Sequence, residues 1–396
     1  LAFCTTLDVH KVSSSTDRYA NAKTKVMYYL QALLLSIAVG FITQRHGRLS
    51  GFKAIMILAW FVGVSLIFWH YGPIGQWSFY QNDQYFHWKI VAEGFGSEFN
   101  LTFDRLNFFR VPYTAPAYLL TQVGFDPTLS LKFVSLCCAL ANISLIERVL
   151  RNRAHNFSIL AFWLIAGPVS TFFSVLALRE TMMLLCVSQL FLGVSQSGKA
   201  LSLLVLVILR PHLAAAIVIG QLWGWAFSRT SRRWYLPAVL ATAVVPIYLG
   251  TIGFSLGNYV IYRLPLQLYQ DLFLKDQVIQ IFSAFAGLQF FTVAYQTVEF
   301  TTRSLLLIRL IFPEIVLVPL AFSASCFFLT PQTTRLKLSV LATFVFFMSV
   351  SSGTEYLSVR QSLPMMSIMG VAVILSFFPA NERSQSQQDD TRLTSV

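Results

Sequence analysis

Long apolar runs recur along this 396-residue chain, and they constrain its fold more than any other feature. Hydrophobic residues make up 56% of the sequence and charged residues only 12%, whereas soluble globular chains carry about 25% charged residues. Many runs approach the roughly 20 apolar residues that a helix needs to cross a bilayer. One soluble core does not explain so many separate runs. We therefore expect an all-α, polytopic transmembrane helical bundle with about 10–13 membrane segments and outer-face loops or re-entrant helices.

The apolar runs also divide the chain into regions. We expect spans over residues 26–42, 54–71, 129–146, 157–178, 181–194, 201–209, 213–227, 235–254, 305–329, 338–350 and 363–378. Two further segments, 111–123 and 278–295, fit amphipathic or re-entrant helices. The expected domains are a polar N-terminal segment over 1–26, a transmembrane helical domain over 27–380 with outer loops at about 72–127 and 255–303, and a disordered tail over 381–396.

Lysine and arginine residues indicate the orientation of these spans. Basic clusters lie at 45–53, 148–153, 199, 229–233 and 335–337. If all of them face the cytoplasm, the spans alternate consistently through most of the chain, and the formal charge of +12 belongs to cytoplasmic loops rather than to a nucleic-acid site. The basic segment 1–26 then faces outward, unless the first apolar run does not cross the membrane.

The first outer loop contains the segment "SFYQNDQYFHWKIVAEG", from Ser78 to Gly94. A helix here would place Asp83 and His87, four residues apart, on one face. An aspartate in this position could act as a general base or bind a metal together with a phosphate. The alternative is an interfacial helix with Asp83 as its cap and with tyrosine and tryptophan at the bilayer surface.

A second segment, "LALRETMML", places Arg179 and Glu180 inside an apolar run over 157–194. This run is too long for one straight span, so a turn at these two residues divides it. Charges at membrane depth are costly and often functional, and an arginine can hold a phosphate with two hydrogen bonds. The alternative is the outward tip of a hairpin whose charged side chains extend to the membrane surface.

Two further apolar stretches are interrupted by charged residues. In "LVILRPHLAAA", Arg210 and His212 flank Pro211, which frees backbone groups and is tolerated inside protein or beside a wet cavity. In "TEYLSVRQSLPMM", Arg360 precedes the last expected span. A surface turn in the first case, and an ordinary snorkelling arginine in the second, are the alternatives.

The charged positions share one side of the membrane in the expected topology. They are Asp83, Arg179, Glu180, Arg210, His212 and Arg360. An arginine-rich cavity at the outer leaflet suits a lipid-linked phosphate, and a nearby carboxylate could deprotonate an acceptor hydroxyl. The cysteines show no metal-ligand spacing, so we expect no cofactor.

The order of these features resembles the GT-C superfamily of membrane glycosyltransferases, which use polyprenyl-phosphate-linked sugars. Asp83 in "QNDQYFHW" matches the acidic residue of their first outer loop. The stretches "FFSVLALRE", "LRPH" and "VRQSLPMM" look like segments of bacterial polysaccharide polymerases of the O-antigen type. Many GT-C members carry two neighbouring acidic residues in the loop, whereas Asn82 and Gln84 flank Asp83 here, so the resemblance leaves a divalent metal in doubt.

The resemblance implies a glycosyltransferase of the bacterial inner membrane. It would move a sugar or oligosaccharide from a polyprenyl-linked donor to a glycan or lipid acceptor at the outer face, in cell-surface polysaccharide biosynthesis. Asp83 and Glu180 are the expected catalytic carboxylates. The expected substrate-binding residues are Arg179, Arg210, His212, Arg360 and His87.

Two other classes of protein fit part of this pattern. A transporter or flippase of lipid-linked oligosaccharide also places charges and broken helices in the membrane, but an internal two-fold repeat is expected there and none is evident. A non-catalytic membrane assembly subunit would need no convergent charged cavity.

Overall fold

The structure is a computed structural model. It describes residue 37 and residues 81–94, 110–152, 170, 173–174, 176–227, 234–242, 314–327, 333–354 and 359–377. The expected N-terminal segment 1–26, the spans 54–71 and 278–295, the loop 255–303 and the tail 381–396 lie outside the described residues, as does the span 26–42 apart from Ile37.

The described residues form helices and no strands, which confirms the all-α class for this part of the chain. The labelled helices are α3 (Gln81–Glu93), α5 (Val111–Gln122), α6 (Pro127–Asn152), α8 (Glu180–Leu192), α9 (Gln196–Leu209), α10 (Pro211–Ala226), α15 (Glu314–Cys326), α16 (Thr334–Thr354) and α17 (Val359–Phe377). A short helix also covers 235–242. The first outer loop, expected over 72–127, therefore contains two helices, α3 and α5.

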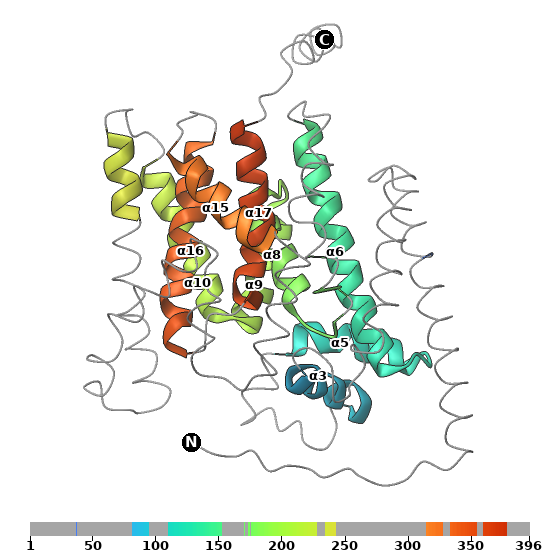
Figure 1. Cartoon of the computed structure of the whole chain (residues 1–396). Coiled ribbons are helices and arrows are strands. Elements are labelled where there is room, and N and C mark those ends of the chain that lie inside the picture. Colours follow the sequence, from blue (N-terminus) through green and yellow to red (C-terminus); the bar gives the residue numbers. More distant parts are fainter. Residues whose placement is uncertain are drawn as a thin grey trace, which may run out of the picture.

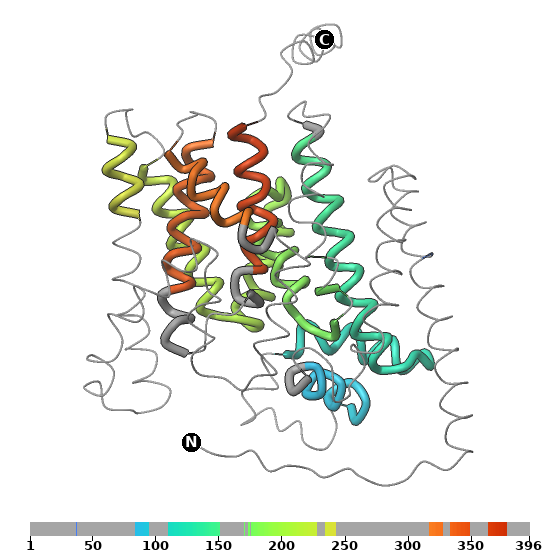
Figure 2. Tube along the Cα trace, in the orientation of Figure 1, coloured from blue at the N-terminus to red at the C-terminus, as the bar shows by residue number. Residues whose placement is uncertain are grey.

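The helices are arranged in two directions (Figure 1). Helices α6, α8, α10, α16 and α17 stand side by side, whereas α3 and α5 lie across the lower end of this bundle in the view shown. The tube in Figure 2 follows the same arrangement along the sequence. We call the end covered by α3 and α5 the capped end.

Helices α10 and α16 pack with their backbones in close approach. Gly220 and Gly224 are separated by three residues in "GQLWG", and both face α16. A Cβ atom on Gly220 would lie 2.5 Å from the carbonyl oxygen of Ser339, and one on Gly224 would lie 2.7 Å from that of Arg335. Small residues at this spacing allow helix backbones to approach when side chains would hold them apart.

Contacts along this pair show that the two helices are antiparallel. Gly224 faces Arg335 near the start of α16, whereas His212 at the start of α10 stacks on Phe347 in its later half. The start of α10 therefore lies at the capped end, and Arg335 lies at the opposite end. The charge pattern also predicts opposite sides for Arg210 and Arg335, with Arg210 outside and Arg335 in the cytoplasm, and this assignment stays a prediction.

Polar side chains connect the helices inside the bundle. Asn142 of α6 donates from Nδ2 to Oγ of Ser367 in α17 at 3.0 Å, and both side chains are buried. Lys337 of α16 donates from Nζ to the carbonyl oxygen of Ser325 at 2.8 Å, near the C-terminus of α15. A cation there offsets the partial negative charge of the helix end.

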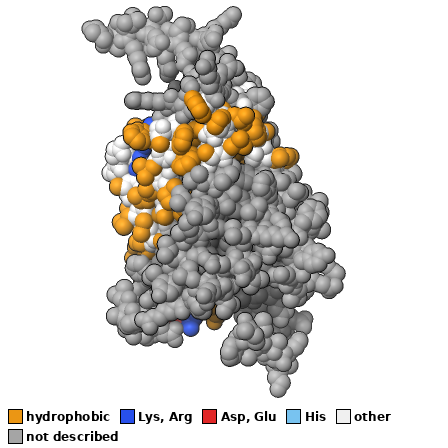
Figure 3. Space-filling view, turned by 90° about the vertical axis from the view of Figure 1, so that its left-hand side faces the viewer, with side chains coloured by type: hydrophobic (Ala, Val, Ile, Leu, Met, Phe, Trp, Pro, Cys, Tyr) orange, Lys and Arg blue, Asp and Glu red, His pale blue; other side chains and the backbone are white. Residues whose placement is uncertain are grey.

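One segment of the described helices, the 24 residues Pro127–Leu150 within α6, is long and apolar enough to cross a membrane, with a mean hydropathy of 1.9 over its 18-residue window. Apolar side chains also cover much of the described surface on the side seen in Figure 3, where few charged side chains are visible. The exposed apolar side chains include Leu201, Leu204, Val207, Leu222, Trp225, Leu236 and Leu240.

Candidate functional site

A buried turn over residues 176–180 lies at the centre of the candidate site. Leu176, Ala177, Leu178 and Glu180 are 0% exposed, and Arg179 is half-buried. Helix α8 begins at Glu180, which confirms that the apolar run is divided at the two charges. The turn is enclosed by protein, however, and does not form the exposed hairpin tip that is one alternative from the sequence.

Helix α3 holds this turn through the backbone of Ala177. The peptide N–H of Ala177 donates to Oε1 of Gln84 at 3.1 Å. The carbonyl oxygen of Ala177 lies 2.9 Å from Nδ1 of His87, which donates to it. Gln84 and His87 are three residues apart on one helix face, and both are buried. Helix α3 thus holds both the N–H and the carbonyl oxygen of Ala177.

Helices α5 and α6 hold the next residue of the turn. Ser135 of α6 donates from Oγ to the carbonyl oxygen of Leu178 at 3.0 Å. The hydroxyl of Tyr113 in α5 lies 2.8 Å from Oγ of Ser135 and donates to the carbonyl oxygen of Leu131 at 3.0 Å. The Tyr113 ring also meets the edge of the His87 ring, with 5.1 Å between centroids. The turn is therefore braced from three helices.

Glu180, the first residue of α8, follows the turn and is fully buried. Burial raises the pKa of the Tyr113 hydroxyl, and the Glu180 carboxylate is among the neighbouring charges that raise it further. A carboxylate within this range of a buried tyrosine favours the neutral phenol. Both Glu180 and Tyr113 are buried, Glu180 at the start of α8 and Tyr113 in α5.

On its other side, the turn reaches the break between α9 and α10. Arg179 donates from a terminal guanidinium nitrogen to the carbonyl oxygen of Leu209 at 3.1 Å. Leu209 ends α9 and Pro211 begins α10, so the expected discontinuity is confirmed. Pro211 is tolerated because the first position of a helix has no intrahelical N–H bond to lose. Arg210 lies between the two helices with φ −160° and ψ 81°.

Arg210 and His212 form a compact group with Phe347. Arg210 donates from Nε to Nε2 of His212 at 3.1 Å. The guanidinium carbon lies 5.3 Å from the centroid of the Phe347 ring, and the imidazole stacks on the same ring at 5.5 Å with an interplanar angle of 11°. A cation above an aromatic face is attracted by the ring quadrupole. The phenyl ring thus fixes the place of both polar groups.

The hydrogen bond from Arg210 requires an unprotonated Nε2, so His212 is neutral. His212 lies at the helix break, outside the expected spans 201–209 and 213–227. Burial lowers the pKa of His212 well below its ordinary value, and the charges of Arg210 and Arg179 lower it further. Both guanidinium groups therefore lie within electrostatic range of one imidazole.

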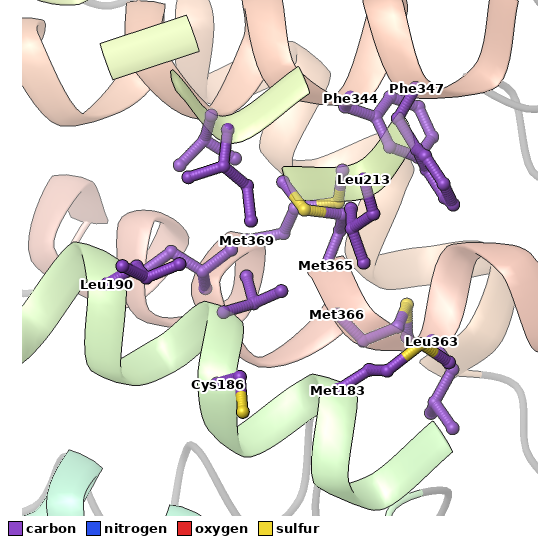
Figure 4. Close-up of a cluster of buried hydrophobic side chains, with 14 of the residues drawn as sticks. Met183, Cys186, Leu190, Leu213, Phe344, Phe347, Leu363, Met365, Met366 and Met369 are labelled. Carbon is purple, nitrogen blue, oxygen red and sulfur yellow. The ribbon is translucent and has the colours of Figure 1, made fainter. Parts of the chain in front are cut away.

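Helices α8 and α10 both begin in this region, at Glu180 and Pro211. Met183 of α8, Leu213 of α10 and Leu363 of α17 belong to one cluster of buried apolar side chains, in which Met183 lies beside Leu363 (Figure 4). Each of these residues lies in the first or second turn of its helix. Helix N-termini carry partial positive charge and favour anions. The N-terminal ends of α8 and α10 thus follow directly on Arg179 and Arg210, and Met183 connects the start of α8 to α17.

The structure therefore brings together part of the expected site. Arg179, Glu180, Arg210 and His212 lie at one end of the bundle, and His87 is joined to them through Ala177. Asp83 lies in the first turn of α3, next to Gln84, and Arg360 is the second residue of α17. The side chains of Asp83 and Arg360 lie outside the described part of the structure.

Some residues of the site were not anticipated from the sequence. They are Gln84, Tyr113, Ser135 and Phe347. Only Gln84 carried a usable signal, because its spacing from His87 puts the two polar side chains on one face of a helix. The contacts of the other residues depend on tertiary packing.

Two guanidinium groups, a neutral imidazole and the N-termini of α8 and α10 lie beside a short buried turn. Groups of this kind can hold an anion. Within the described residues, no group of three or more histidine, cysteine, aspartate or glutamate side chains is placed to hold a metal ion. Neither a protein-family model, nor a curated protein, nor a solved structure matches this chain.

Proposed function

We propose that this chain is a multi-pass glycosyltransferase of the bacterial inner membrane. It would transfer a sugar or oligosaccharide from a polyprenyl-linked donor to a glycan or lipid acceptor at the outer face. The observation that carries the proposal is that Arg179 bonds the carbonyl oxygen of Leu209, one residue before Arg210, at the break between α9 and α10. Two arginines at one helix break of an apolar bundle suit an anionic headgroup on an apolar tail.

The phosphate of the donor would lie against these two arginines. Each guanidinium has five N–H donors, so Arg179 can bond the carbonyl oxygen of Leu209 and a phosphate oxygen at the same time. Charge-assisted bonds of this kind are roughly twice as strong as neutral ones. The N-termini of α8 and α10 would add to the attraction. Arg360, near the start of α17, is proposed as a third phosphate or sugar ligand.

The acceptor would be activated by a carboxylate. Asp83 is the proposed general base, because it precedes Gln84 on the helix that contacts the turn. Glu180 is proposed to orient the arginine pair from the start of α8. His212 would align Arg210 and face the acceptor. His87 is buried against the turn, which favours an indirect role over the substrate contact expected from the sequence.

The proposed membrane setting is supported by the directions of the helices. Arg210 lies at the capped end and Arg335 at the opposite end, in agreement with an outward site and cytoplasmic basic loops. Exposed leucine and tryptophan side chains on α9 and α10 suit contact with lipid. The crosswise helices α3 and α5 would then rest at the outer interface.

The test is complementation in cells that lack the native gene. Arg210→Ala and Asp83→Asn are expected to abolish high-molecular-weight surface glycan on gels, while both proteins still reach the membrane fraction. Arg335→Ala is the matched control. This arginine of α16 is exposed and lies near the C-terminal end of α10, far from Arg210. Full glycan production by Arg210→Ala would contradict the proposed site.

The location of the accumulated intermediate separates this function from a flippase. A blocked transferase leaves lipid-linked oligosaccharide on the outer face, where a lectin that cannot cross the membrane binds it in spheroplasts. A blocked flippase leaves the same lipid on the inner face. Accumulation only on the inner face in Arg210→Ala cells would therefore overturn the transferase proposal.

A further inference from the structure

Helix α3 combines an exposed aromatic face with a buried polar one. Tyr85 and Phe86 are 43% and 47% exposed, whereas Gln84 and His87 are 0% and 1% exposed. A polar pair on the inner face of a surface helix is costly unless each group is hydrogen-bonded. Here both groups meet that condition through Ala177, which lies 90 or more residues further along the chain. The buried polar side chains of α3 thus pair with the backbone of the turn.

The turn depends on these bonds because it has few of its own. Residues 176–178 lie outside any helix, so their peptide groups lack a regular hydrogen-bonding ladder. Gln84 and His87 satisfy the N–H and the carbonyl oxygen of Ala177, and Ser135 satisfies the carbonyl oxygen of Leu178. A buried peptide group that loses its partner costs about 1–3 kcal/mol. Removal of either α3 side chain would therefore allow this backbone to move.

Any such movement is passed directly to Arg179. Only Leu178 separates it from Ala177, and its guanidinium reaches across to the end of α9 at Leu209. A phosphate site depends on the angle and position of each guanidinium, because two parallel hydrogen bonds must form together. The place of Arg179 is therefore set by the position of Ala177.

We propose that Gln84 and His87 are positioning residues that control phosphate binding by Arg179 through the backbone of Ala177. This inference rests on the proposed function, since it assigns to α3 the control of that same phosphate site. Neither side chain touches the substrate. Helix α3 thereby couples the surface at the capped end to the arginine pair inside the bundle.

The experiment compares four variants of the full-length protein in detergent. Gln84→Leu and His87→Leu each remove one bond to Ala177. His87→Asn keeps an N–H donor near the position of Nδ1 and serves as the conservative variant. Ser367→Ala is the stability control, because it removes the buried hydrogen bond to Asn142 and leaves the turn intact.

Two measurements are made on each variant. Amide hydrogen exchange over 176–183 reports the mobility of the turn, and titration with undecaprenyl phosphate, against undecaprenol without phosphate, reports binding. The leucine variants are expected to exchange faster over 176–183 and to bind undecaprenyl phosphate about tenfold more weakly or worse. His87→Asn and Ser367→Ala are expected to bind within about threefold of wild type.

The outcomes distinguish the inference from the function on which it rests. If wild type binds the phosphate and the leucine variants bind equally well, the positioning role is wrong and the proposed function stands. If wild type does not distinguish undecaprenyl phosphate from undecaprenol, the proposed function is wrong. The positioning role of Gln84 and His87 is then wrong as well. A loss of binding in Ser367→Ala equal to that in Gln84→Leu would also overturn the positioning role.

Discussion

The close approach of α10 and α16 predicts that alanine at Gly220 destabilises the protein. The added Cβ atom would lie 2.5 Å from the carbonyl oxygen of Ser339 and 2.9 Å from the peptide nitrogen of Thr343, whereas ordinary contact begins near 3.4 Å. Both are backbone atoms, so no side-chain rotation removes the clash. The helices must separate by roughly 1 Å.

The cost of this separation follows from packing. A gap of about 0.5–1 Å forfeits roughly a quarter to a half of the dispersion energy between facing atoms. Overpacking of a tight interface usually costs about 1–3 kcal/mol. Alanine also gains about 1 kcal/mol of helix propensity over glycine, which partly hides the effect. A matched glycine in another helix is therefore needed.

Gly198 in α9 provides this control. A Cβ atom there would meet the terminal Nε2 of Gln189 at 2.6 Å, and that flexible side-chain end can move away. Both variants replace a helical glycine by alanine, so their difference removes part of the propensity gain and reports mainly the packing cost. We expect Gly220→Ala to be less stable than Gly198→Ala by about 1–3 kcal/mol.

The assay is unfolding by SDS in mixed micelles, followed by tryptophan fluorescence. Trp223 lies in α10 and donates from Nε1 to Oγ1 of Thr242 at 2.6 Å, so separation of the helices alters its environment. The double variant Gly220→Ala/Gly224→Ala is expected to lose less than the two single losses combined, because one separation relieves both clashes. Equal stability of Gly220→Ala and Gly198→Ala would refute the tight interface.

Three further predictions concern other contacts. Ser367→Ala removes the bond from Asn142 between α6 and α17, and unfolding by SDS should show a loss of about 0.5–1.5 kcal/mol; no loss would contradict the buried bond. Lys337→Met removes the bond to the carbonyl oxygen of Ser325 at the end of α15 and should cost about 1–3 kcal/mol, whereas an unchanged midpoint would show that the bond does not stabilise this helix end. His212 has a lowered pKa when folded, so the unfolded chain takes up a proton first as the pH falls below about 6.5. Stability should therefore decrease from pH 7 to pH 5 in wild type and decrease less in His212→Phe, and identical pH profiles would contradict a neutral, buried imidazole.

The sequence predicted those features that depend on local chemistry. Pro211 cannot continue α9, so the break beside Arg210 followed from one residue type. The start of α8 at Glu180 followed from the length of the apolar run and from its two charges. The helical class followed from the recurring apolar runs and from a share of charged residues well below that of soluble proteins.

The contacts that build the site depend on the packing of distant segments. Nothing near Ala177 indicates that its peptide groups bond to α3, because Gln84 and His87 lie about 90 residues earlier. The burial of the turn was missed for the same reason, since α3, α5 and α6 enclose it. The spacing of Gly220 and Gly224 is visible in the sequence, but it does not identify α16 as the partner.

In the proposed mechanism, Arg179 and Arg210 together hold a lipid phosphate. The most direct measurement is an experimental structure of the protein in nanodiscs with undecaprenyl phosphate. We expect density for the phosphate within hydrogen-bonding distance of both guanidinium groups, beside the N-terminal turns of α8 and α10, with the prenyl chain against the apolar surface. A phosphate bound elsewhere, with Arg179 and Arg210 occupied only by protein groups, would contradict it.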